Sequence, residues 1–117
     1  MYSPKVLDHF EHPRNSGQVE NASARVRVEN PACGDILELS ASFQSGKIAD
    51  IRFRAKGCVP SIACASALTE LVGGKTIQEA TRLTREDLLR ELGELPEASQ
   101  HASYLAIDAL RELLRKI

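Results

Sequence analysis

Apolar and polar residues alternate along the first half of the chain. The alternation has a period of two in residues 24–29, 37–43 and 48–55. This period is typical of strands that bury one face and expose the other. Residues 30–35 and 44–47 separate these stretches and are rich in Pro, Gly, Asn, Asp and Ser, which favour turns. The first half of the chain therefore predicts three strands in an antiparallel meander.

A repeat of three and four residues, typical of helices, replaces the alternation after Gly57. Thr76 with Glu79 and Thr84 with Asp87 have the spacing of helix-capping pairs. The predicted helices are a short one that begins at Ser3-Pro4 and ends at Pro13, then residues 60–72, 77–83, 85–92 and 100–117. A small sheet needs its apolar face covered. We therefore predict an α+β fold with a three-stranded antiparallel sheet meander covered on one face by helices, in a single domain over residues 1–117.

Length and composition exclude several classes of function. The chain has 117 residues and a net charge of −1 with both signs interspersed, so neither nucleic acid nor an anionic membrane is an expected partner. No apolar run approaches the roughly 20 residues of a transmembrane helix, and no signal-peptide core is expected. Three widely spaced cysteines are an odd number, which argues against a disulfide framework. These features predict a cytoplasmic protein with reduced thiols.

Four potential metal ligands fall at the ends of predicted elements. Cys33 and Asp35 lie in the turn between the first two strands, Cys58 lies between the third strand and a helix, and His101 begins the last helix. Because the connections of a meander alternate between the ends of the sheet, Cys33 and Cys58 are expected at the same end. The topology does not place His101. Two thiolates, a carboxylate and an imidazole are suitable ligands for zinc or iron.

Three other residues are assigned to packing or to the surface. His9 and His12 are three positions apart, without a cysteine or carboxylate cluster at ligand spacing, and are expected to face solvent or to bond locally. Cys64 lies six residues after Cys58, which is on the order of 6 Å along the axis from the start of the helix. That separation favours a buried core cysteine, with a functional thiol as the alternative.

Several stretches resemble the U-type iron–sulfur cluster assembly scaffolds, the IscU/NifU N-terminal family, over nearly the whole chain. The matching stretches are Tyr2-Ser3, residues 8–15 (DHFEHPRN), residues 31–35 (PACGD), Gly57-Cys58 followed by residues 61–63, and residues 101–106. The resemblance implies an IscU-like fold of the SufE/NifU type. It also implies a scaffold that accepts sulfur from a cysteine desulfurase, assembles a [2Fe–2S] cluster and passes it to recipient proteins. By motif position, Cys33, Asp35, Cys58 and His101 are its iron or cluster ligands.

The chain departs from this family at three places. The third cluster cysteine of the family directly follows the histidine, and Ala102 occupies that position here. Val59 replaces the glycine after the second cysteine, and residues 95–99 (LPEAS) replace the chaperone-recognition segment Leu-Pro-Pro-Val-Lys. The resemblance therefore does not carry over docking of an Hsp70-type chaperone, and it leaves the cluster without its third thiolate.

Three functions are compatible with these residues. The first is a cytoplasmic, non-enzymatic scaffold for iron or a [2Fe–2S] cluster, with zinc as a possible stand-in. The alternative is a degenerate paralogue in which Cys33, Asp35, Cys58 and His101 hold zinc or iron as a structural or regulatory module. A third interpretation is a thiol enzyme with Cys58 as nucleophile and His101 as base, for which the sequence offers no orienting third group.

Overall fold

The sheet has the predicted antiparallel meander. The computed structural model describes residues 2–31 and 34–117. Within them, the strands β1 (Ala24–Asn30), β2 (Asp35–Gln44) and β3 (Lys47–Lys56) form one sheet in the order β1-β2-β3. The register places Val26 opposite Leu39 and Leu39 opposite Phe53, so these apolar side chains lie on one face. The pairs Asn30–Asp35 and Ile36–Lys56 place the start of β2 and the end of β3 at the same end of the sheet.

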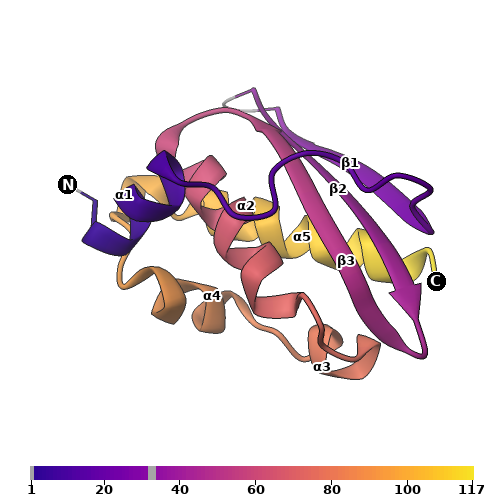
Figure 1. Cartoon of the computed structure of the whole chain (residues 1–117). Coiled ribbons are helices and arrows are strands. Elements are labelled where there is room, and N and C mark those ends of the chain that lie inside the picture. The colour runs from indigo at the N-terminus through magenta and orange to yellow at the C-terminus, as the bar shows by residue number, and fades with distance from the viewer. Residues whose placement is uncertain (1, 32–33) are drawn as a thin grey trace.

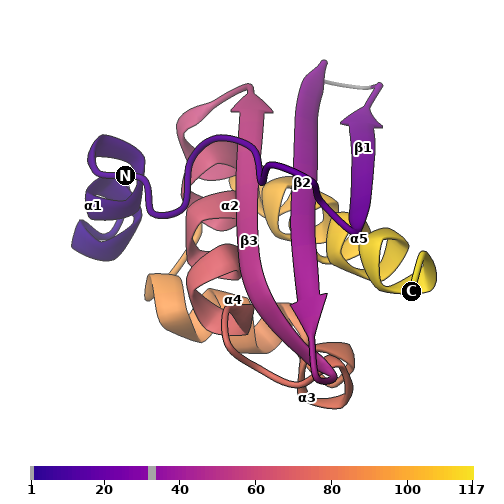
Figure 2. The same cartoon turned by 45° about the vertical axis from the view of Figure 1, so that its right-hand side comes forward.

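Helices cover one face of this sheet, as predicted. They are α1 (Pro4–Glu11), α2 (Val59–Val72), α3 (Ile77–Thr81), α4 (Arg85–Leu92) and α5 (His101–Arg115), with a 3-10 turn, η1 (Glu97–Ser99), before α5. Figure 1 shows α2 and α5 beneath the sheet, with α4 on the side of these helices that faces away from the strands. In Figure 2, α1 lies beside α2 and α3 lies near the β2–β3 hairpin. No helix within the described residues is long and apolar enough to cross a bilayer.

The helix α2 is buried around most of its circumference. Its small and apolar side chains, including those of Ala63, Ala67 and Leu68, are fully buried against the sheet and the surrounding helices. A helix that is apolar on every side belongs in the interior of a protein. The buried hydroxyls of Ser66 and Thr69 take part in hydrogen bonds, which compensates for their removal from water. The helix α2 is thus the central element of the core.

The structure contradicts the expectation that His9 faces solvent or bonds only locally. His9 is 4% exposed, and its Nδ1 lies 2.8 Å from Oγ of Ser66 on α2. The same Ser66 oxygen accepts a hydrogen bond from the backbone N–H of Arg14 at 2.8 Å. Burial, with the nearby Arg14 cation, lowers the pKa of His9 from its ordinary value. The expectation failed for His9 because its burial results from the docking of α1 on α2, which is a tertiary contact. His12 is exposed, as expected.

The segment after α1 pairs with the outer edge of β3 at Phe53. The N–H of Gly17 donates to the carbonyl oxygen of Phe53 at 2.8 Å, and the N–H of Phe53 donates to the carbonyl oxygen of Asn15 at 2.9 Å. Ser16 consequently forms a parallel bridge with Phe53. Figure 2 shows this segment continuing across the strands toward β1. The first part of the chain therefore contacts both α2 and β3.

The helices α3 and α5 each end two residues before the predicted position. α3 ends at Thr81 rather than at residue 83 because Thr84 has an extended backbone and caps α4. α5 ends at Arg115, which leaves Ile117 beyond the last turn and 56% exposed rather than buried. Both predicted capping pairs, Thr76 with Glu79 and Thr84 with Asp87, are present.

Candidate metal centre

Three of the four predicted ligands come together at one end of the sheet. Asp35 is the first residue of β2, Cys58 is the N-cap of α2, and His101 is the first residue of α5. One ligand atom from each of the three residues lies within 4.8 Å of those of the other two. Cys58 Sγ is 3.5 Å and His101 Nε2 is 3.6 Å from the same carboxylate oxygen, Oδ2 of Asp35. The packing of α5 beside α2 therefore supplies the histidine that the strand topology alone did not place.

These separations match those of metal ligands. In a tetrahedral site with bonds of ~2.0–2.3 Å, the ligand atoms stand roughly 3.3–3.8 Å from one another. The two distances to Asp35 Oδ2, 3.5 Å and 3.6 Å, lie in that range. Sulfur, imidazole nitrogen and carboxylate oxygen are all ligands that zinc and iron accept. The three side chains therefore fit a divalent metal ion in both spacing and chemistry.

The hydrogen bond of the His101 ring determines which nitrogen is free to bind a metal. Nδ1 of His101 lies 3.2 Å from the carbonyl oxygen of Ala98. A carbonyl oxygen only accepts hydrogen bonds, so Nδ1 carries the proton in the neutral ring and Nε2 carries the lone pair. Nε2 is buried and has no hydrogen-bond partner within the described residues. A cation bound between this nitrogen and the Asp35 carboxylate would satisfy both groups, and the second nitrogen of a metal-bound histidine is typically held this way.

Two further residues lie next to Asp35, and the sequence analysis identified neither of them as part of the site. The Ser61 hydroxyl donates to Asp35 Oδ2 at 2.5 Å and lies 3.3 Å from Cys58 Sγ. A Cβ atom on Gly57 would stand only 2.5 Å from Asp35 Oδ1, so glycine permits the close approach of the carboxylate. The spacing of three between Cys58 and Ser61 was a usable signal, because N-cap and N3 side chains are neighbours.

Of the two remaining cysteines, the structure describes Cys64 but not Cys33. Cys33 and Ala32 lie outside the described residues, so the placement of the fourth predicted ligand stays a prediction. Ala102, at the position of the family's third cysteine, is 1% exposed. Cys64 is fully buried, which agrees with the core interpretation, and burial, with the nearby Cys58 thiol, raises its pKa to about 12. A thiol in that environment stays protonated at neutral pH and is a poor ligand.

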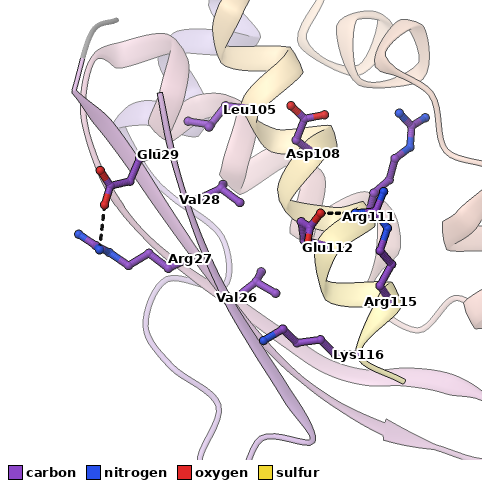
Figure 3. A pocket seen from close by; sticks show the side chains of 10 residues that line it. All are labelled: Val26, Arg27, Val28, Glu29, Leu105, Asp108, Arg111, Glu112, Arg115 and Lys116. Carbon is purple, nitrogen blue, oxygen red and sulfur yellow. Dashed lines mark hydrogen bonds and ion pairs between the residues drawn. The ribbon is translucent and has the colours of Figure 1, made fainter. Parts of the chain in front are cut away.

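A prominent groove of the molecule lies elsewhere. It has a volume of about 650 Å³ and runs between β1 and α5. Figure 3 shows an apolar floor that includes Val26, Val28 and Leu105, surrounded by charged side chains. Arg27 pairs with Glu29 at 2.8 Å, and Arg115 pairs with Glu112. None of its lining residues is a cysteine or histidine, so this groove does not belong to the candidate metal centre.

Comparison with known proteins identifies the family to which this chain belongs. The NifU-like N terminal domain family matches residues 1–116, and the chain belongs to that family. The iron-sulfur cluster assembly scaffold protein IscU 1 of Archaeoglobus fulgidus is 45% identical over 114 residues, which cover 97% of this chain and 74% of that protein. The corresponding IscU of Escherichia coli is 43% identical over 114 residues, covering 94% of this chain and 88% of that protein.

Solved structures share the fold. FiSufU from Fervidobacterium islandicum AW-1 superposes with a TM-score of 0.82 at 24% sequence identity, covering 97% of this chain and 96% of that one. The N-terminal part of a NifU-like protein from Brucella abortus gives a TM-score of 0.79 at 22% identity, covering 98% and 92% of the two chains. These likenesses confirm the IscU/NifU-type fold.

Proposed function

We propose that this chain is a scaffold protein for iron–sulfur cluster assembly. Asp35, Cys58 and His101, together with Cys33, would bind iron or a [2Fe–2S] cluster as cargo. The high identity to IscU scaffold proteins over most of the chain supports this function. The observation that carries it is the buried Nε2 of His101, which faces the carboxylate of Asp35 at 3.6 Å without a hydrogen-bond partner in the described part of the chain.

In this proposal, sulfur comes from a cysteine desulfurase. Of the two cysteines that the structure describes, Cys58 is exposed and Cys64 is buried, so Cys58 is the accessible acceptor. A desulfurase persulfide would transfer its outer sulfur to the Cys58 thiolate, which becomes a persulfide while the desulfurase cysteine leaves as a thiolate. Each sulfur then needs two electrons from an external reductant to become a bridging sulfide. Cluster-recipient proteins would take the product at the same exposed end of the molecule.

The arrangement favours a scaffold over a thiol enzyme. The Cys58 thiol donates to Asp35 and contacts Ser61, whereas no hydrogen bond between the side chains of Cys58 and His101 occurs in the described structure. In a nucleophile–base pair the thiol would be hydrogen-bonded to the imidazole. The free thiol of Cys58 is also consistent with the reducing, cytoplasmic location proposed for the protein.

An Hsp70-type chaperone is not part of the proposal. In place of the family's extended recognition segment, Leu95 is 6% exposed and residues 97–99 form the 3-10 turn η1. The Ala98 carbonyl in this turn binds the His101 ring. If this segment left its place in the fold to bind a chaperone, the candidate metal centre would therefore be disturbed.

Anaerobic reconstitution tests the proposed function. Apoprotein is incubated with Fe²⁺, cysteine, a cysteine desulfurase and dithiothreitol, and cluster formation is followed by absorption and circular dichroism. Cys58→Ala and His101→Ala should lower cluster yield severely, since each removes a proposed ligand. Cys64→Ala and His12→Ala are matched controls, because they remove a buried thiol and an exposed imidazole outside the site. A wild-type chain that forms no cluster, or four variants of equal yield, would contradict the proposal.

The alternative is a zinc or iron module that assembles no cluster. It is favoured by Ala102, which removes the family's third thiolate from a position that is 1% exposed. Elemental analysis of freshly purified protein separates the two functions. A colourless protein with one zinc, lost in Cys58→Ala and His101→Ala, and no cluster under the conditions above would establish the alternative.

A further inference from the structure

A second group of potential metal ligands lies where α1, α2 and α4 meet. His9 of α1, Glu70 of α2 and Glu91 of α4 each offer one ligand atom, and these three atoms lie within 4.8 Å of one another. Glu70 lies twelve residues beyond Cys58, which is roughly 18 Å along the axis of α2. This group is therefore separate from the candidate metal centre, and it contains no sulfur.

The imidazole of His9 is held in a fixed orientation. Its side chain is 6% exposed, and its Nδ1 lies 2.8 Å from Ser66 Oγ. Nε2 consequently points toward the carboxylates, at 3.8 Å from Glu70 Oε1, which is beyond hydrogen-bonding distance. A ring nitrogen of a largely buried side chain that faces carboxylates without a hydrogen bond to them is the arrangement expected of a ligand awaiting a cation. Ser66 has the orienting role that a residue behind a metal-bound histidine usually has.

The surrounding charges also favour a divalent cation. Asp8, Glu70 and Glu91 are the carboxylates that act on His9, and Arg14 is the cation that does so. Arg14 binds Asp8 at 2.6 Å and lies 3.7 Å from Oε2 of Glu70, so Oε1 remains on the His9 side. Three carboxylates and one guanidinium leave two negative charges. A divalent ion would neutralise them.

We propose that His9, Glu70 and Glu91 form a second site, which binds a divalent first-row transition metal ion. One imidazole and two carboxylates suit Mn²⁺, Fe²⁺, Co²⁺ or Zn²⁺ and offer no thiolate to select a softer ion. Glu70 is 46% exposed on its side chain, so it is free to move the short distance needed for coordination. The bound ion would join three helices that are far apart in sequence.

A hydrolytic role for the same residues is excluded by burial. Ser66, His9 and Glu70 follow one another like a serine triad, but Ser66 is fully buried at 0% exposure. Its hydroxyl oxygen also accepts the backbone N–H of Arg14. No substrate reaches such a hydroxyl.

Manganese binding tests the second site independently of cluster assembly. The double variant Cys58→Ser/His101→Ala removes the first site, and Mn²⁺ alone is the probe, because it favours oxygen and nitrogen ligands and its free form is measured by electron paramagnetic resonance. We expect one Mn²⁺ per chain in this background. Glu70→Gln and Glu91→Gln keep the side-chain shape and should each weaken binding roughly tenfold or more.

Glu94→Gln is the matched control, since Glu94 is an exposed glutamate three residues after Glu91 and outside the cluster. It should change the Mn²⁺ affinity less than about twofold if the cluster is the site. Mn²⁺ should also raise the melting temperature of the double variant, because it binds only the folded arrangement of α1, α2 and α4. Glu91→Gln should reduce this rise. Absence of Mn²⁺ binding at millimolar concentration, or equal weakening by all three glutamine substitutions, would overturn the proposal.

Discussion

His101 Nε2 lies 3.6 Å from Asp35 Oδ2, on the side of the imidazole opposite its hydrogen bond to Ala98. The two residues are the first of α5 and the first of β2, so their meeting depends on how the last helix docks against the sheet. Because the carboxylate is 4% exposed, its charge needs a partner at close range. The imidazole of His101 lies at such a range, beside the hydroxyl of Ser61 and the thiol of Cys58, which both donate to the same carboxylate.

Gly57→Ala should reduce metal retention without unfolding the chain. The added methyl group would stand 2.5 Å from Asp35 Oδ1 and 2.8 Å from its Cγ, so the carboxylate must move away from Cys58 and His101. We expect zinc or iron affinity to fall by roughly tenfold or more, as for other changes that misplace a ligand. Competition with a chromophoric chelator measures the affinity. Lys56→Ala, at an exposed neighbouring residue, should leave it unchanged, and equal affinities of Gly57→Ala and wild type would refute the steric argument.

Ala102→Cys should increase the yield and lifetime of a reconstituted cluster. The substitution restores a thiolate at the position of the family's third cysteine, and iron–sulfur clusters are most often held by thiolates. The decay of the cluster absorption in air provides the measurement. Ala98→Cys adds a thiol at an exposed position of η1 and serves as the control. Equal decay rates in wild type and Ala102→Cys would mean that another group already occupies the fourth ligand position.

Cys64 should resist alkylation in the folded protein, whereas Cys58 should react. Burial raises the Cys64 pKa to about 12, and the thiolate is the reactive form. Iodoacetamide labelling followed by peptide mass spectrometry should show modification of Cys64 only after denaturation. Rapid labelling of Cys64 under native conditions would contradict its assignment to the core.

Substitutions of Cys64 should change stability but not metal content. Cys64→Ser should cost about 1–3 kcal/mol, since it buries a hydroxyl in place of a thiol, and Cys64→Ala should cost less.

The raised Cys64 pKa also predicts that the stability of the fold depends on pH. Above its ordinary value of 9.0, the unfolded thiol loses its proton while the folded one keeps it up to about 12, so wild-type stability falls between these values. In denaturant titrations across this pH range, the free energy of unfolding of Cys64→Ala should decrease less than that of wild type. Loss of bound metal in Cys64→Ala would refute the packing role.

Ser66→Ala should destabilise the fold by about 1–3 kcal/mol, because it leaves the Arg14 N–H and the buried His9 Nδ1 without their shared partner. Chemical denaturation measures this loss. Ser42→Ala is a control at a hydroxyl in β2 for which the described structure records no side-chain hydrogen bond. A cost equal to that of the control would show that Ser66 does not hold α1 on α2.

Features that depend on residues close together in the sequence were predicted better than features that depend on long-range packing. The capping pairs Thr76–Glu79 and Thr84–Asp87 were found correctly because both partners lie within one helical turn. Meander topology, which needs only the strand order, correctly placed the turn between β1 and β2 and the end of β3 at the same end of the sheet. By contrast, the positions of His9 and His101 depend on how α1 and α5 dock, and no periodicity in the sequence encodes a docking angle. Family resemblance supplied His101, but nothing in the sequence indicated that His9 would be buried.

The hydrogen bonds from residues 15 and 17 to Phe53 also have a consequence for self-association. A three-stranded sheet has two edges to which a foreign strand could attach. On the β3 edge, this segment pairs with Phe53, and residues 74–75 bond to Ile48. Within the described residues, β1 forms the other border, where the exposed Arg25, Arg27 and Glu29 place charge along the strand. Charged edge strands discourage stacking into fibrils. Growth of this sheet by a second molecule is therefore blocked on one side by the protein's own backbone and hindered on the other by its charges.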